Sequence, residues 1–201
     1  MISTGESEEV ECGFVAGALV QTASGPVPIE LIEAGDLVLS LPETGSELTY
    51  KRVVSTVVHQ QKEVILVSYI VHDEARARHL VVTGNYPFVV MDKGLLRADR
   101  MTQGEFLRHR EGRETYVFLA RALFNADREG FGWTCHPGFG KGTEIDFRSR
   151  HFEIVSERSS NGEDSGAWGL VTQDVYNIEI DSPGGICVGD VIVRVPSRHP
   201  K

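Results

Sequence analysis

The stretch GFVAGALVQTASGPVPIELIEAGDLVLS, residues 13–40, alternates short apolar runs with glycine-containing turns. Its first run, residues 14–20, is typical of a short buried strand. Residues 22–25 and 33–36 have the composition of turns, because glycine tolerates the positive backbone angles that tight turns require. Residues 37–39 predict another buried strand. The stretch therefore indicates a compact β unit, from which the rest of the chain can be interpreted.

The β pattern continues beyond this unit. Apolar and β-branched runs predict strands at residues 50–59, 63–71, 79–91, 144–147, 151–156, 175–180 and 187–195. Residues 95–110 are expected to include a short helix or turn, and residues 115–124 fit either a strand or a helix. Residues 125–142, rich in glycine and aromatics, and the polar residues 157–166 predict long surface loops. Such loops in compact domains often carry function, so they are the expected binding surface.

Composition limits the classes of function. The chain has 201 residues, 41% of them hydrophobic, which is enough for one domain with its own core. A formal net charge of -9 disfavours nucleic acid and anionic membranes and leaves other proteins as expected partners. No apolar run approaches the roughly 20 residues of a membrane span. Cys12, Cys135 and Cys187 lack CxxC spacing, which disfavours disulfides or structural zinc and favours a reducing cytoplasm.

The chain is expected to form one domain with short tails. Residues 1–11 contain several glutamates and no apolar core, so we predict an acidic, disordered tail and no signal peptide. The domain is predicted to cover residues 12–196, and residues 197–201 form a second short tail. These short flanks predict a free-standing domain.

Several separated motifs carry a family resemblance. They are FVAG at 14–17, PIE at 28–30, GDLVLS at 35–40, TGNYPF at 83–88 and VYNIEI at 175–180. The sequence resembles the Hint (hedgehog/intein) superfamily, in particular the Hint domains of bacterial polymorphic toxins. The resemblance implies an all-β, intein-like horseshoe of two pseudo-symmetric β halves with long loops. A pattern of apolar-x-x-Gly-acid-apolar-apolar, shared by residues 32–38 and 101–107, fits such a repeat.

The resemblance also implies a chemistry, and this chain departs from it at four positions. In the family, a Cys or Ser attacks its own preceding carbonyl, a second-block His with a nearby Thr polarises that amide, and a C-terminal His–Asn pair cleaves the other end. Gly13 directly precedes Phe14, where the nucleophile belongs, and has no side chain. Tyr86 replaces the second-block His, and with a pKa near 10 it does not shuttle protons. Arg194 and Val195 replace the terminal His and Asn, leaving neither a proton shuttle nor a cyclising amide.

Cys12 has two interpretations. It lies one residue before the nucleophile position, and a local bulge would let it act as a shifted nucleophile together with Thr83. Otherwise it is an incidental thiol at the end of the tail, which we favour because the other catalytic positions are also altered.

The remaining candidates are weaker. His59, His72 and His79 lack the spacing of metal ligands, so we expect no metal and no cofactor. In the predicted loop 125–142, three aromatic residues either pack the loop onto the body or form an exposed binding patch. They are Phe131, Trp133 and Phe139.

Three hypotheses follow. The first is a catalytically inactive, free-standing Hint-fold protein that acts as a protein–protein interaction module, linked to a polymorphic toxin or secretion system in an immunity or adaptor role. Its partner would be a toxin or a toxin-bearing secreted protein. The second is self-processing through Cys12, and the third is a structural module within a larger secreted machine.

Overall fold

The computed structural model describes residues 11–136, 141–149, 151–159 and 169–196, and within these ranges the regular structure is β strands and two short 3-10 helices. The first strands are β1 (Phe14–Val15), β2 (Leu19–Thr22), β3 (Gly25–Pro28), β4 (Leu37–Pro42), β5 (Thr49–Val71), β6 (Arg78–Thr83), β7 (Pro87–Val90) and β8 (Gly94–Arg97). The later ones are β9 (Thr115–Ala122), β10 (Phe124–Asn125), β11 (Phe131–His136), β12 (Lys141–Asp146), β13 (Glu153–Ser159), β14 (Thr172–Ile180), β15 (Gly184–Val188) and β16 (Val191–Arg194). The 3-10 helices are η1 (Ile29–Leu31) and η2 (Ala98–Arg100). None of the helices in the described ranges has the length and hydropathy to cross a membrane.

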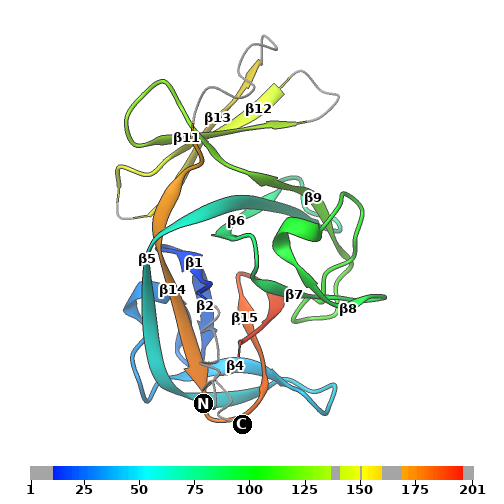
Figure 1. The fold of residues 1–201 in the computed structure, drawn as a ribbon. Coiled ribbons are helices and arrows are strands. Elements are labelled where there is room, and N and C mark those ends of the chain that lie inside the picture. The colour runs from blue at the N-terminus through cyan, green and yellow to red at the C-terminus, as the bar shows by residue number, and fades with distance from the viewer. Residues whose placement is uncertain (1–10, 137–140, 150, 160–168, 197–201) are drawn as a thin grey trace, which may run out of the picture.

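Twelve strands form one large, curved sheet around the 23-residue strand β5, which pairs with β4, β6, β9 and β14 (Figure 1). The sequence predicted two strands, at residues 50–59 and 63–71. They are continuous, and Gln61 takes a positive φ of 50° between them. Because the early part of β5 pairs with β4 and β14 and the late part with β6 and β9, this one strand belongs to both halves of the fold.

A tight turn after η1 anchors the first half to β5. The N–H of Gly35 donates to the carbonyl of Val53, and the N–H of Val53 donates to the carbonyl of Asp36, each at 2.8 Å. Gly35 has a φ of 103°, which explains why glycine occupies this position.

The second half repeats this turn after η2. The N–H of Gly104 donates to the carbonyl of Val117, and the N–H of Val117 donates to Glu105, again at 2.8 Å each. Gly104 has a φ of 89°. The weak sequence repeat at residues 32–38 and 101–107 therefore marks two equivalent turns, and the predicted all-β fold of two pseudo-symmetric halves is confirmed.

The equivalence extends to the loops before each helix. Ala18 donates its N–H to Val15 and accepts from Ile29, as Tyr86 donates to Thr83 and accepts from Ala98. Each of these loops leads into a hairpin, β2–β3 in the first half and β7–β8 in the second. The TGNYPF motif and the opening FVAG motif are thus the same loop in the two halves.

A separate four-stranded sheet, in the order β10-β11-β12-β13, lies at the upper end of the molecule in Figure 1. The prediction of a loop over residues 125–142 is wrong at residue 125, at residues 131–136 and at residues 141–142, which belong to β10, β11 and β12. Residues 137–140 lie outside the described residues. Glycine misled the prediction because it serves close packing here. A Cβ on Gly142 would lie 2.0 Å from the Trp133 ring. The predicted loop 157–166 begins within β13, and residues 160–166 lie outside the described residues.

Two hydrophobic clusters hold these parts together. The larger one fills the space between the two halves and includes Phe14, Tyr86 and Phe88. The smaller one includes Leu66, Leu119 and Ile145, and it joins the large sheet to the four-stranded sheet. The small sheet is therefore packed onto β5 and β9 through buried side chains.

Candidate functional site

Gly13 lies against the TGNYPF loop, where the family resemblance places the reacting residue. Its N–H donates to Thr83 Oγ1 at 3.2 Å, and its carbonyl accepts from the N–H of Thr83 at 3.0 Å. The next residue, Phe14, pairs with Tyr176 of β14 on one side and with Val82 of β6 on the other. The second-block Thr is therefore bound to the main chain of residue 13, as the resemblance implies.

The structure leaves no room for a side chain at Gly13. A Cβ built on this residue would lie 2.6 Å from the carbonyl oxygen of Tyr176, and no real Cβ makes such a contact with a backbone atom. A nucleophile at position 13 would thus require β14 to move.

Tyr86, in place of the second-block His, is a core residue. It is fully buried, its ring centroid lies 4.5 Å from that of Phe14, and its hydroxyl donates to Asn177 Oδ1 at 3.1 Å. Burial, with a smaller contribution from Cys12, raises the pKa of Tyr86 well above its usual value. The phenol remains protonated and acts as a hydrogen-bond donor.

Cys12 lies in the core, so the expectation that its thiol sits at the end of a tail is wrong. Its side chain is 0% exposed, and burial raises the pKa of the thiol to about 12. At pH 7 such a thiol is protonated, whereas the thiolate is the form that attacks carbonyls. The carbonyl that Cys12 would attack belongs to Glu11, and it accepts from Asn85 Nδ2 at 3.3 Å. The Glu11 carbonyl is therefore hydrogen-bonded, and the neighbouring Cys12 thiol is protonated.

The two C-terminal positions are also occupied by structural contacts. The Arg194 guanidinium donates to Glu43 Oε1 at 2.7 Å, and Arg194 pairs with Gly185 in the β15–β16 hairpin. Val195 is buried, and its N–H donates to the carbonyl of Gly184 at 3.2 Å. Both residues fasten the end of the domain.

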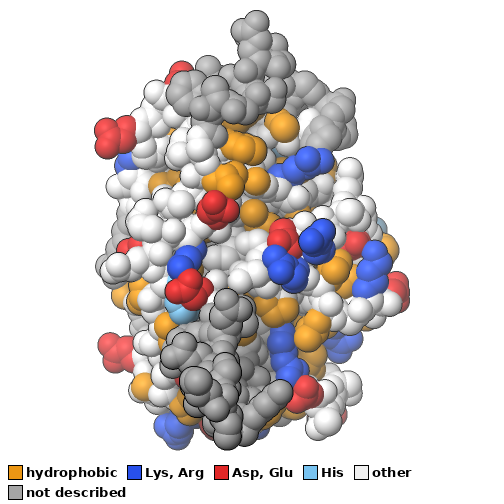
Figure 2. All heavy atoms as spheres, viewed as in Figure 1, with side chains coloured by type: hydrophobic (Ala, Val, Ile, Leu, Met, Phe, Trp, Pro, Cys, Tyr) orange, Lys and Arg blue, Asp and Glu red, His pale blue; other side chains and the backbone are white. Residues whose placement is uncertain are grey.

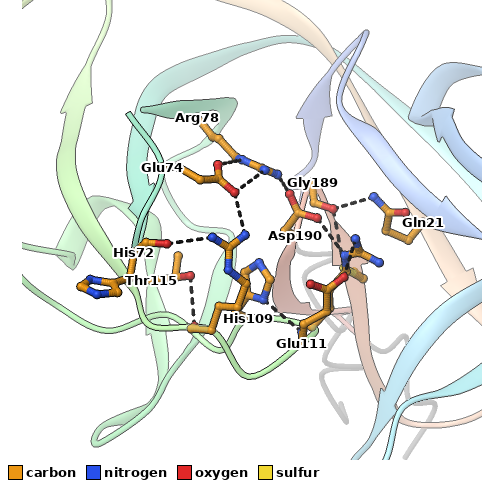
Figure 3. Close-up of polar contacts among 12 residues, drawn as sticks. Gln21, His72, Glu74, Arg78, His109, Glu111, Thr115, Gly189 and Asp190 are labelled. Atoms are coloured by element: carbon orange, nitrogen blue, oxygen red, sulfur yellow. Dashed lines mark hydrogen bonds and ion pairs between the residues drawn. The ribbon is translucent and has the colours of Figure 1, made fainter. Parts of the chain in front are cut away.

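A charged network that sequence reasoning missed fixes the turn before β16 (Figure 3). Asp190 forms ion pairs with Arg78 and Arg110, and Glu74 forms ion pairs with Arg78 and Arg113. The network joins segments that are distant in sequence, so no local pattern could reveal it. His109 lies beside it, and burial lowers the pKa of its imidazole. Because its charges are paired, the network is a structural clamp.

The other predicted residues are spread over the molecule. Phe131 and Trp133 are buried, so they pack the segment onto the body of the protein and form no exposed patch. The guanidinium groups of Arg128 and Arg148 cover the Phe131 ring at 3.9 and 4.3 Å from its centroid. Phe139 lies outside the described residues. Of the three histidines, His59 lies in β5 opposite Val175, His72 follows β5, and His79 Nδ1 lies 2.8 Å from Ser68 Oγ. Among described residues no cluster of three His, Cys, Asp or Glu has metal-site geometry.

Comparison with known proteins places these observations in a family. The family model of the pretoxin HINT domain matches residues 19–121, about half of the chain and both repeated turns. The chain belongs to this family. No curated protein sequence matches this pretoxin HINT domain significantly.

Solved structures support the same fold. An intein-like domain from Clostridium thermocellum is similar with a TM-score of 0.57 and 22% identity, over 92% of this chain and 98% of that one. A DnaB intein from Synechocystis sp. PCC 6803 is similar with a TM-score of 0.56 and 15% identity, over 92% and 99% of the two chains. At these identities the likeness concerns the fold.

Proposed function

We propose that this pretoxin HINT domain does not cleave itself and serves as a protein–protein interaction module in the context of a bacterial polymorphic toxin. The observation that carries the proposal is the closed position at Gly13, where a Cβ would meet backbone atoms of Tyr176. Loss of a nucleophile alone would leave an empty place in the site. Here β14 occupies that space, so the main chain itself has adapted to glycine.

The neighbouring positions support the same proposal. Tyr86 donates to Asn177 in the core, and Arg194 is held by Glu43. The Cys12 thiol has a pKa near 12, which opposes the competing function, self-cleavage at the Glu11–Cys12 bond. The residues at the catalytic positions thus contribute packing and hydrogen bonds.

Intact-mass measurement tests the absence of cleavage. The purified protein is incubated for a day with millimolar dithiothreitol at pH 7 and pH 9, beside a Cys12→Ala control. We expect the mass of wild type to stay unchanged at both values. Loss of residues 1–11 from wild type, but not from the Cys12→Ala protein, would establish cleavage through Cys12 and refute this part of the proposal.

We propose a toxin or toxin-bearing secreted protein as the partner, with an immunity or adaptor role in the cytoplasm. The net charge of -9 suits a basic partner surface, although acidic and basic side chains are interspersed on the face shown in Figure 2. The cysteines of the described residues are free thiols, which suits a reducing compartment. Purification of the tagged protein from its native cells should yield a toxin-bearing protein in near-equal amount, and purification without such a partner would contradict this role.

A further inference from the structure

Strand β9 has one paired edge and one edge that is covered over only part of its length. On the paired side, Leu66 lies opposite Arg121 and Ser68 opposite Leu119 of β9. The N–H of Leu123 donates to Val64 of β5, so Leu123, and by alternation Arg121 and Leu119, point their main-chain groups toward β5. The main-chain groups of Ala120 and Ala122 therefore point away from β5.

The outer edge is covered at its beginning. There, Val117 exchanges hydrogen bonds with Gly104 and Glu105, and the N–H of Leu107 donates to Thr115. Beyond Val117, no main-chain hydrogen bond from another described segment reaches the outward groups of Ala120 and Ala122. Among the described residues, the outward N–H and C=O groups of Ala120 and Ala122 thus have no main-chain partner.

A pocket of about 510 Å³ lies along this same stretch. Five consecutive residues of β9, from Phe118 to Ala122, line it. Their side chains belong to opposite faces of the sheet, because Leu119 packs in the smaller hydrophobic cluster while Ala120 and Ala122 pack against the larger one. A pocket lined by both faces of one strand lies against the edge of that strand.

The walls of the pocket come from both parts of the molecule. His136, at the end of β11, contacts Phe118 edge-on at 5.7 Å between centroids, and Met101, Thr102 and Gln103 also line the pocket. Arg121 is exposed in the lining, and no described carboxylate forms an ion pair with its guanidinium. The carboxylate in the lining, Asp99, forms ion pairs with Arg97 and Arg100. The pocket therefore combines a free backbone edge, apolar contacts and one uncompensated positive charge.

We propose that the groove along residues 118–122 of β9 is a docking site for an extended segment of a partner protein, which adds to the large sheet as an antiparallel or parallel strand. Unpaired N–H and C=O groups along an edge are complementary to another extended backbone. The charge of this groove is opposite to the net charge of the chain, which favours a basic surface elsewhere on the partner. Within the groove, the uncompensated Arg121 selects a segment with an acidic side chain at that position, and the apolar lining favours small or β-branched neighbours. The inference rests on the proposed interaction function and assigns it a surface.

The test uses substitutions that change the outward N–H alone. Ala120→Pro removes one outward donor and leaves the ladder with β5 intact, because proline is tolerated at an edge where its nitrogen faces outward. Ala120→Ser keeps the N–H and is the matched control. Circular dichroism and urea unfolding establish that each variant is folded, and Ala122→Pro replaces Ala120→Pro if the latter is not.

The probe is a displayed library of linear 12-residue peptides selected on immobilised wild type. We expect enrichment of acidic, β-branched peptides that bind Ala120→Pro at least tenfold more weakly than wild type and bind Ala120→Ser as wild type. Arg121→Glu should weaken the same peptides by a similar factor. Failure to enrich any peptide, or equal binding to Ala120→Pro, would overturn the proposal.

Light scattering on the same proteins distinguishes a second occupant. If wild type forms a dimer that Ala120→Pro dissociates, the groove is filled by another copy of this chain. The proposal that a segment of a partner protein binds there would then be refuted. A native partner that binds wild type and Ala120→Pro equally would refute this surface and leave the proposed interaction function standing.

Discussion

The two halves of the molecule use one backbone design for different purposes. In each half a loop, a hairpin, a 3-10 helix and a glycine turn follow in the same order, and the hydrogen bonds of the two turns match donor for donor. The loop of the second half places Thr83 against the main chain of Gly13 and Tyr86 in the core. The first half has Val15 and Ala18 at the equivalent places. The comparison teaches that the repeat specifies the fold and that a few side chains in one copy specify the site.

Replacing the large residue of the second loop should have the largest effect. Tyr86→Ala removes a fully buried ring and is expected to lower the free energy of unfolding by about 3–5 kcal/mol. Its counterpart Ala18→Gly should cost no more than about 1 kcal/mol. Urea unfolding measures both. Equal losses in the free energy of unfolding would show that the two loops contribute alike to stability, against the difference described above.

Adding a side chain at Gly13, beside Thr83, should have the second-largest effect on stability. Gly13→Ala is expected to cost about 1–3 kcal/mol, because its Cβ meets the Tyr176 carbonyl. Gly169→Ala, whose Cβ would approach its nearest neighbour at 3.6 Å, is the matched control and should be near neutral. Gly13→Cys should be destabilised like Gly13→Ala and show an unchanged intact mass. A stable Gly13→Cys protein that sheds residues 1–12 would show that the site is open.

The two glycine turns offer the sharpest test of equivalence. Gly35 and Gly104 both have positive φ, and a Cβ on either would meet no atom within 4 Å. Alanine at each should cost about 1–2 kcal/mol through backbone conformation alone. The two losses in urea unfolding should agree closely. A cost at one position only would mean that the turns differ in ways that their hydrogen bonds do not show.

The smallest expected effect concerns the acidic residue of the second turn. Burial raises the pKa of Glu105, but hydrogen bonds from Lys93 and Thr102 outweigh it, so the net pKa is lowered from 4.5. Because the pKa of Glu105 is lower in the folded than in the unfolded chain, its carboxylate stabilises the fold at pH values above the unfolded pKa of about 4.5. That contribution is lost as the pH falls from there through the pKa of the folded state. Glu105→Gln should be less stable than wild type by under about 1 kcal/mol at pH 7, with the difference shrinking toward pH 3. A stability difference between the two proteins that grows toward pH 3 would show that folding does not lower the pKa of Glu105.

Local patterns in the sequence were sufficient for most strands, for the repeat and for the family. The strand at 175–180 and the loop at 83–88 carry their own apolar and turn signals, and the structure places them as expected. Strand β11 was missed because Gly132 and Gly142 resemble turn residues. In the structure, the rings of Phe147 and Trp133 occupy the space that a side chain at these two positions would need. The sequence alone does not distinguish a glycine that allows a turn from one that allows close packing.

The site was only partly accessible from sequence for a similar reason. The substitutions at Gly13 and Tyr86 were visible in the motifs, but the closure of position 13 depends on Tyr176. The Arg78–Asp190 clamp likewise joins residues far apart in the chain. Contacts of this kind leave no local pattern, so only the folded chain reveals them.

The pairing of Phe14 with Tyr176 has a consequence for the synthesis of this domain. At roughly 5–20 residues per second, a ribosome makes Tyr176 on the order of 10–30 s after Phe14. During that interval β1 lacks one of its two partner strands, and the hydrophobic cluster that contains Cys12 lacks its members from Ile178 onward. The environment of the Cys12 thiol is therefore completed only when the last strands of the domain have been made.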